Sequence, residues 1–134
     1  MKSLLLDTHI FVPCFLYPER IHRDIFQKID SADICCFSVI NLIEIMNLRR
    51  KGTLDITYSI SEIIDAAKND LRFHLLDIEA QDIETLENLP FLKTHKDPND
   101  RMLIAQAKAR GLTVVTADRK FLDYDVDVLL SDPV

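Results

Sequence analysis

Residues 95–118 read HKDPNDRMLIAQAKARGLTVVTAD, and this stretch decides the fold. Asp97 is placed to cap a helix, Pro98 occupies the first helical position and Gly111 ends the helix, so the pattern predicts a helix over residues 98–110. The apolar run at residues 112–115 predicts a buried strand directly after it. This helix and strand form the clearest local pattern in the chain.

The same alternation of helix and strand extends outward to both ends. Because strands and helices alternate throughout, the order predicts an α/β fold with a mostly parallel central sheet of four to five strands, flanked by helices on both faces. Ser38 is expected to cap one helix and Gly52 to stop it. The expected strands are residues 2–6, 33–37, 73–76, 112–115 and 126–130, and the expected helices are residues 10–16, 19–29, 39–50, 59–69, 79–86, 98–110 and 118–122.

Length and composition suit one domain covering residues 1–134. The chain has 134 residues, is 48% hydrophobic and contains only two glycines, so we expect no flexible linker inside it. The formal net charge of −6 counts against a nucleic-acid partner, because phosphate backbones bind basic surfaces. That objection weakens if the acids are concentrated in a cluster that binds divalent cations.

The cysteines and the N-terminus indicate where the protein works. Cys14, Cys35 and Cys36 are odd in number and two of them are adjacent, which argues against a disulfide framework and favours a reducing, cytoplasmic location. The apolar run before Asp7 is too short for a signal peptide, and no run reaches the roughly 20 residues of a membrane span. We therefore expect no membrane association.

Acids follow three of the expected strands. Asp7, Asp77 and Asp118 each come after a strand, and sites in open parallel sheets form beyond the carboxyl ends of the strands. The alternative for each one is an N-cap of the next helix. Individually, these positions do not separate the two roles.

Two further acids lie inside expected helices. Glu44 falls at helical spacing between Ile40 and Leu48, on a helix face that is otherwise apolar. A buried carboxylate there requires a basic partner, a change of protonation or a bound cation. Asp100 falls at the third helical position, where an acid also favours the helix dipole.

The combination of these patterns resembles the PIN-domain nucleases, and most closely the toxin ribonucleases of the VapC type. The resemblance covers residues 4 to about 130. It rests on LLDTH at residues 5–9, Glu44 inside an apolar helix, and the stretch at residues 95–118, which is highly specific in both residues and spacing.

The resemblance implies the roles of the site residues. It makes Asp7, Glu44, Asp100 and Asp118 the acidic quartet that binds Mg²⁺ or Mn²⁺. Supporting groups would be Thr8, Thr116 and Asp97, the last as either a helix cap or a support of the metal site. His95 and Arg101 also match, and they would either touch substrate phosphate or brace the loop.

The chemistry of the quartet agrees with the family's activity. Hard divalent cations prefer oxygen ligands, and they serve phosphodiester hydrolysis by activating a water and stabilising developing negative charge. The resemblance implies hydrolysis of RNA to a 5′-phosphate and a 3′-hydroxyl, although metal chemistry alone leaves DNA open. It also implies a homodimer and an antitoxin protein that binds across the acidic cleft.

Basic groups near the expected helix ends are candidates for contacts with RNA. They would steer RNA to an acidic surface, whereas the alternative is that they are ordinary charges at helix ends. The candidates are Arg49, Arg50, Lys51, Arg119 and Lys120, besides His95 and Arg101.

Two other classes of protein compete with the nuclease. A phospho-acceptor receiver domain shares the α/β order, and Asp77 and Thr116-Ala117 match it superficially. A receiver needs a second acid beside Asp7 and a Lys after the last strand, which are absent, and it leaves Glu44 unexplained. The second alternative is a non-catalytic protein-interaction module of the same fold. The intact quartet of acids in this sequence argues against such a module.

Overall fold

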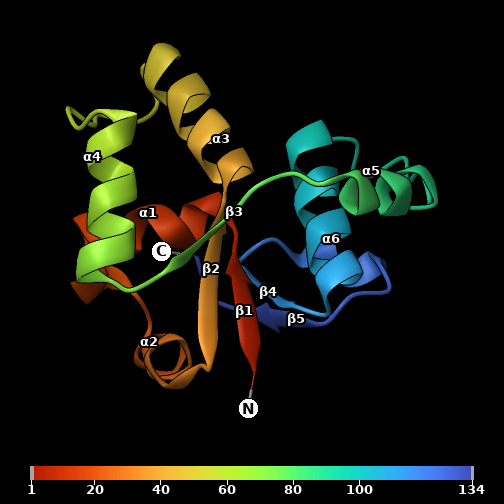
Figure 1. The fold of residues 1–134 in the computed structure, drawn as a ribbon, viewed down its shortest axis with the longest axis horizontal. Helices are drawn as coiled ribbons and strands as arrows, with labels where there is room; N and C mark the ends of the chain where they lie inside the picture. Colours follow the sequence, from red (N-terminus) through yellow and green to blue (C-terminus); the bar gives the residue numbers. More distant parts are fainter. Residues whose placement is uncertain (1, 134) are drawn as a thin grey trace.

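The computed structural model describes residues 2–133. Its centre is one five-stranded parallel sheet in the order β3-β2-β1-β4-β5, which agrees with the predicted fold class (Figure 1). The register pairs Leu5 of β1 with Cys36 of β2 and with Val114 of β4. The strands are β1 (Ser3–Leu6), β2 (Ile34–Ser38), β3 (His74–Leu76), β4 (Thr113–Thr116) and β5 (Val128–Leu130).

Helices connect the strands, and most begin where the sequence predicts. Ser38 caps α3 and Asp97 caps α6, while Gly52 and Gly111 adopt positive φ angles just beyond these two helices. The α-helices are α1 (Thr8–Leu16), α2 (Arg23–Ser31), α3 (Val39–Arg50), α4 (Ile60–Asp65), α5 (Ala80–Glu87) and α6 (Pro98–Arg110). Shorter helical segments are η1 (Pro18–Arg20), η2 (Ala66–Asp70) and η3 (Arg119–Asp123).

Two cores cover the two faces of the sheet. Leu4 and Leu6 of β1 point into a core shared with α1, α2 and α4, whereas Leu5 points into a core shared with α6 and η3. Figure 1 shows α1, α2 and α4 on one side of the strands and α5 and α6 on the other. Burial on both faces explains why the central strands β1, β2 and β4 are mostly apolar.

The helix predicted over residues 19–29 is wrong in its first part. Pro18 starts a short 3₁₀ turn, and Ile21 then takes an extended conformation that buries its side chain in the core beside α2. His22 caps the new helix, which begins only at Arg23. Tertiary burial of Ile21 therefore overrides the local helical pattern. Likewise, the helix predicted over residues 59–69 is α4 followed by the π-helical turn η2.

Within residues 2–133, no helix has both the length and the apolar character that a membrane crossing requires.

Candidate metal centre

Two acids lie directly beyond the carboxyl ends of adjacent strands. Asp7 follows β1, and its Oδ1 accepts a hydrogen bond from the backbone N–H of Thr8 at 2.7 Å. Asp118 follows β4, and its Oδ1 accepts from the N–H of Lys120 at 2.9 Å. Both acids thus cap the next helical segment, as the alternative reading of the sequence required. Capping uses one oxygen of each carboxylate and leaves the other free for further contacts.

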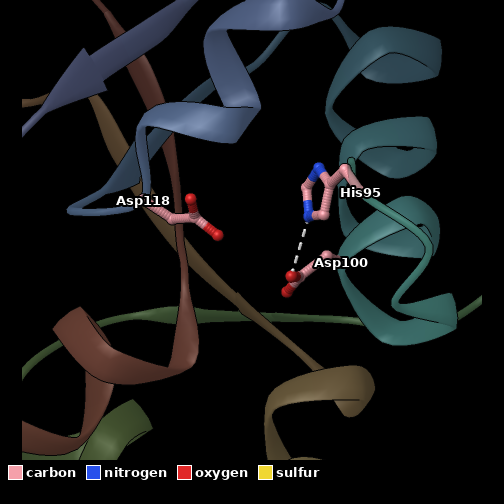
Figure 2. Close-up of side chains that lie close together, drawn as sticks. All are labelled: His95, Asp100 and Asp118. Carbon is pink, nitrogen blue, oxygen red and sulfur yellow. Dashed lines mark hydrogen bonds and ion pairs between the residues drawn. The ribbon is translucent and has the colours of Figure 1, made fainter. Parts of the chain in front are cut away.

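Two acids from helices meet them at this edge of the sheet. Glu44 lies in the middle of α3, which starts after β2, and Asp100 lies in the first turn of α6. One carboxylate oxygen each from Asp7, Glu44 and Asp100 lie within 4.8 Å of one another. Asp118, Asp100 and the ring of His95 form a second group of the same size, drawn in Figure 2. Asp100 belongs to both groups, so it joins the four acids into one cluster.

Hydroxyl groups connect the acids on the β4 side. Thr116 Oγ1 donates a hydrogen bond to Asp7 Oδ2 at 2.8 Å and accepts one from the N–H of Asp118 at 3.0 Å. Thr116 is fully buried, so its contacts are shielded from water. It therefore fixes the first and last acids of the quartet relative to each other.

A second buried chain of hydrogen bonds positions Glu44. Thr8 Oγ1 donates to Glu44 Oε1 at 3.0 Å, and Asn41 Nδ2 donates to Thr8 Oγ1 at 2.9 Å. The carboxamide of Asn41 also accepts from the N–H of Ser38 and donates to the carbonyl of Leu6. Asn41 was not among the residues predicted from the sequence, although a polar residue three positions after a Ser cap is a signal for such a contact.

Crowding and burial perturb the ionisation of three of the acids. Burial is the largest cause, and it raises the pKa of Asp7, of Glu44 to about 7 and of Asp100 to about 6. The charge of Asp7 raises the pKa of Glu44 further, while the hydrogen bond from Thr8 lowers it. These carboxylates therefore repel one another when all are ionised.

This arrangement fits a hard divalent cation. Among residues 2–133, no Lys, Arg or His forms an ion pair with Asp7 or Glu44, which removes a basic partner as the explanation for Glu44. The donors are carboxylate oxygens, which Mg²⁺ and Mn²⁺ prefer, and a cation would relieve the repulsion that raises the pKa of Glu44.

Asp97 and Asp77 belong to neither of the two groups of acids. Asp97 Oδ1 accepts from the N–H groups of Asn99 and Asp100 at 2.9 and 3.3 Å, so this exposed acid caps α6. Asp77 is exposed after β3, an edge strand. The strand order also differs from the 2-1-3-4-5 order of receiver domains, which argues against that alternative.

The residues predicted to contact RNA fall into an exposed group and a buried group. Arg50, Lys51, Arg119 and Lys120 are exposed. Arg49 Nη1 donates to the carbonyl oxygens of Ile56 and Tyr58, which ties α3 to the following loop.

His95 and Arg101 are buried instead. His95 is 3% exposed and faces Asp100, and Arg101 is 9% exposed. The guanidinium of Arg101 donates to the carbonyl oxygens of Leu89 and Pro90. These contacts are the ones expected if Arg101 braces the loop, and a contact with substrate phosphate stays a prediction.

Comparisons with known proteins agree with the fold. The sequence matches the family model of the PIN domain over residues 4–127. No curated protein matches it. Among solved structures, VapBC2 from Rickettsia felis, bound to a DNA fragment from its promoter, is 19% identical with a TM-score of 0.71, and the match covers 97% of this chain and 99% of that one.

Two further structures give a similar result. DNA-bound VapBC from Salmonella typhimurium is 20% identical, with a TM-score of 0.65 and coverage of 96% of this chain and 98% of that one. FitAcB from Neisseria gonorrhoeae is 21% identical, with a TM-score of 0.64 and coverage of 95% and 96%. At these identities the likeness shows a shared fold. Because the family model matches nearly the whole chain, the protein belongs to the PIN domain family.

Proposed function

We propose that this protein is a Mg²⁺- or Mn²⁺-dependent endoribonuclease. PIN domains are nucleases, so family membership supports phosphodiester hydrolysis. The observation that carries the proposal is the convergence of four acids that lie after β1, in α3, in α6 and after β4, with Asp100 common to both of their groups. A protein-interaction module has no need of carboxylates held so close together.

The quartet would hold the cation, and a bound cation would supply an activated water and positive charge beside the scissile phosphate. The residues of the chain prepare that site. Thr116 holds Asp7 and Asp118 together, and Thr8 orients Glu44. Exposed Arg119 and Lys120 directly follow Asp118, where they can attract substrate phosphate.

We also propose that the protein is the toxin of a toxin–antitoxin pair and forms a homodimer. The similar solved structures are VapBC and FitAcB assemblies, which supports a protein partner. Light scattering on the purified protein at micromolar concentration should give a dimer, and a monomer would count against it. The three cysteines are free and buried, which suits a reducing compartment such as the cytoplasm.

A chelator-controlled cleavage assay tests the activity. Structured RNA, including tRNA, and single-stranded DNA of the same sequence are incubated with the protein in EDTA, Mg²⁺ or Mn²⁺. RNA should be cleaved only with a divalent cation. Asp7→Asn, Glu44→Gln and Asp100→Asn should reduce cleavage by orders of magnitude, whereas Asp123→Asn, at an exposed acid of η3, should not.

Full activity in EDTA, or parent-level cleavage by all three variants of the quartet, would overturn the proposal. Preferential cleavage of DNA would support the metal-dependent site but show that the substrate is DNA rather than RNA.

A further inference from the structure

His95 is a buried side chain that the quartet does not include. Its ring is 3% exposed and packs against Phe121 and Tyr124, with ring centroids at 5.2 and 5.4 Å. Its Nε2 lies 2.9 Å from Asp100 Oδ2, and Figure 2 shows the ring edge directed at this carboxylate while Asp118 faces the pair from the other side. The ring therefore contacts the one acid that joins the two halves of the cluster.

The other ring nitrogen indicates which nitrogen carries the proton. Nδ1 is buried and has no hydrogen-bond partner among the described residues. A proton on Nδ1 would be a buried donor without an acceptor and would leave an Nε2 lone pair facing a carboxylate oxygen, and both arrangements are costly. A proton on Nε2 instead donates to Asp100. The contacts thus favour a ring protonated on Nε2.

The backbone of His95 is fixed as firmly as its ring. The hydroxyl of Tyr124 donates to the carbonyl oxygen of His95 at 3.1 Å. Arg101 donates to the same hydroxyl at 3.4 Å and to the carbonyl of Pro90 at 2.7 Å. Because α6, the loop before it and the segment after η3 all hold this residue, its Nε2–H is aimed at Asp100 before any ligand arrives.

We propose that His95 is a positioning residue, whose Nε2–H holds the Asp100 carboxylate where it serves both groups of acids. The inference rests on the proposed function, since it assumes that the quartet holds a divalent cation. In this role His95 does not ligate the cation, because its Nε2 keeps its proton and donates it to Asp100 in the metal-bound protein as well. Hydrogen-bonding partners of metal ligands commonly contribute about 10- to 100-fold to metal affinity.

The first test needs no metal and no substrate. Nitrogen NMR of the metal-free protein labelled with ¹⁵N-histidine reports which ring nitrogen is protonated. Of the four histidines, His95 is assigned by the signal that disappears in His95→Phe. The expected spectrum shows a protonated Nε2 and an unprotonated Nδ1. A His95 ring without a proton on Nε2 would overturn the proposal.

The second test is Mn²⁺ and Mg²⁺ binding by calorimetry on three variants. The amide nitrogen of His95→Gln overlays Nε2, that of His95→Asn overlays Nδ1, and His95→Phe fills the space without a donor. Gln should keep Mn²⁺ affinity within about threefold of the parent, while Asn and Phe should lose about 10-fold or more. The ratio of Mn²⁺ to Mg²⁺ affinity should not change in any of them.

Two outcomes would overturn the role proposed for His95. Equal losses in all three variants, following their melting temperatures, would make its role purely structural. A selective loss of Mn²⁺ affinity in His95→Gln would make the imidazole a metal ligand, because Mn²⁺ accepts nitrogen ligands more readily than Mg²⁺. Either result overturns the proposal. If the parent protein binds no divalent cation, the proposed function fails instead, and the NMR result still decides whether Nε2–H meets Asp100.

Discussion

At the scale of single residues, the site combines acids that repel with polar groups that restrain them. Glu44 and Asp100 are the clearest cases, since burial raises the pKa of both while a hydrogen bond opposes the rise. Such an arrangement is unfavourable in the metal-free protein and becomes favourable when a cation binds. Stability and metal binding should therefore change in opposite directions when one acid is removed.

Glu44→Gln should stabilise the metal-free protein at high pH. The pKa of Glu44 is about 7 in the folded protein, against 4.5 for the isolated group. A raised pKa means that the folded state binds the proton more tightly, so the contribution of this group to stability is full below pH 4.5 and is lost as pH rises through 7.

Thermal melts of the parent and Glu44→Gln in EDTA check this expectation. The variant should gain on the order of 1 kcal/mol at about pH 8, after allowance for solvent screening, and almost nothing at about pH 4. Its further gain in stability from added Mn²⁺ should be smaller than that of the parent. Glu84→Gln, at an exposed acid of α5, is the control and should show neither effect.

Asn41→Ala should destabilise the fold and disturb Glu44 together. Asn41 is fully buried, and its loss leaves the carbonyl of Leu6 and the N–H of Ser38 with one fewer partner. The expected cost is about 2 to 3 kcal/mol in urea unfolding, with weaker Mn²⁺ binding. Asn47→Ala, on the same helix and only half-buried, should cost much less. Equal costs would show that the buried network contributes nothing specific.

At the scale of elements, α6 contributes most to the site because both of its ends are fixed. Asp97 caps its first turn, which contains Asp100, and Gly111 ends it with φ +68°. The first turn is therefore held at the carboxyl edge of the sheet, while the last turn leads directly into β4. The length of α6 therefore places Asp100 beside Asp118, which follows β4.

Gly111→Ala should lower the free energy of unfolding by about 1 kcal/mol, and backbone strain should be the only cause. An added Cβ would meet nothing within 4 Å, so the positive φ is the only source of strain. Arg72 has φ +59° without being glycine, so Arg72→Gly should change stability in the opposite direction. Chemical denaturation of both variants checks the pair, and a neutral Gly111→Ala would contradict this account of the helix end.

Asp97→Ser separates capping from a direct role in metal binding. Serine keeps an oxygen for the N–H groups of Asn99 and Asp100 but removes the charge. Stability should change by less than about 0.5 kcal/mol, whereas Asp97→Ala should cost about 1 kcal/mol. Mn²⁺ affinity by calorimetry should follow stability in both variants. A large loss of affinity in Asp97→Ser, which keeps the cap and its stability, would make the charge part of the metal site.

At the scale of the whole molecule, the proposed RNA substrate is a polyanion that a chain of net charge −6 has to attract. The acidic cluster lies at one edge of the sheet, and exposed Arg119 and Lys120 lie beside it in η3. We therefore expect local charge, rather than net charge, to govern the approach of that substrate.

The double variant Arg119→Ala, Lys120→Ala should weaken RNA binding and flatten its dependence on salt. Each phosphate contact removed should reduce the slope of log affinity against log salt by roughly 0.7 for single-stranded RNA. Metal affinity should not change. The matched control is Arg23→Ala, Lys28→Ala on α2, near the amino ends of the strands (Figure 1). An unchanged salt dependence in the Arg119→Ala, Lys120→Ala variant would show that η3 does not attract RNA.

The sequence by itself determined the order of the elements and the identity of the acids. Helix ends at Asp97 and Gly111 depend on local backbone chemistry, which neighbouring residues define. Apolar runs predicted the strands because both faces of the sheet are buried. The motif LLDTH at residues 5–9, Glu44 inside an apolar helix and the stretch at residues 95–118 then carried the family resemblance, and the family model confirms the family.

Only the tertiary structure decided how those residues meet. It placed Asp100 in both groups of acids, set Asn41 behind Thr8, and buried His95 against Asp100. It also broke the helix predicted over residues 19–29, because burying Ile21 outweighs continuing a local pattern. These contacts join residues far apart in the chain, so they follow from strand order and packing on both faces of the sheet, which no local stretch of sequence encodes.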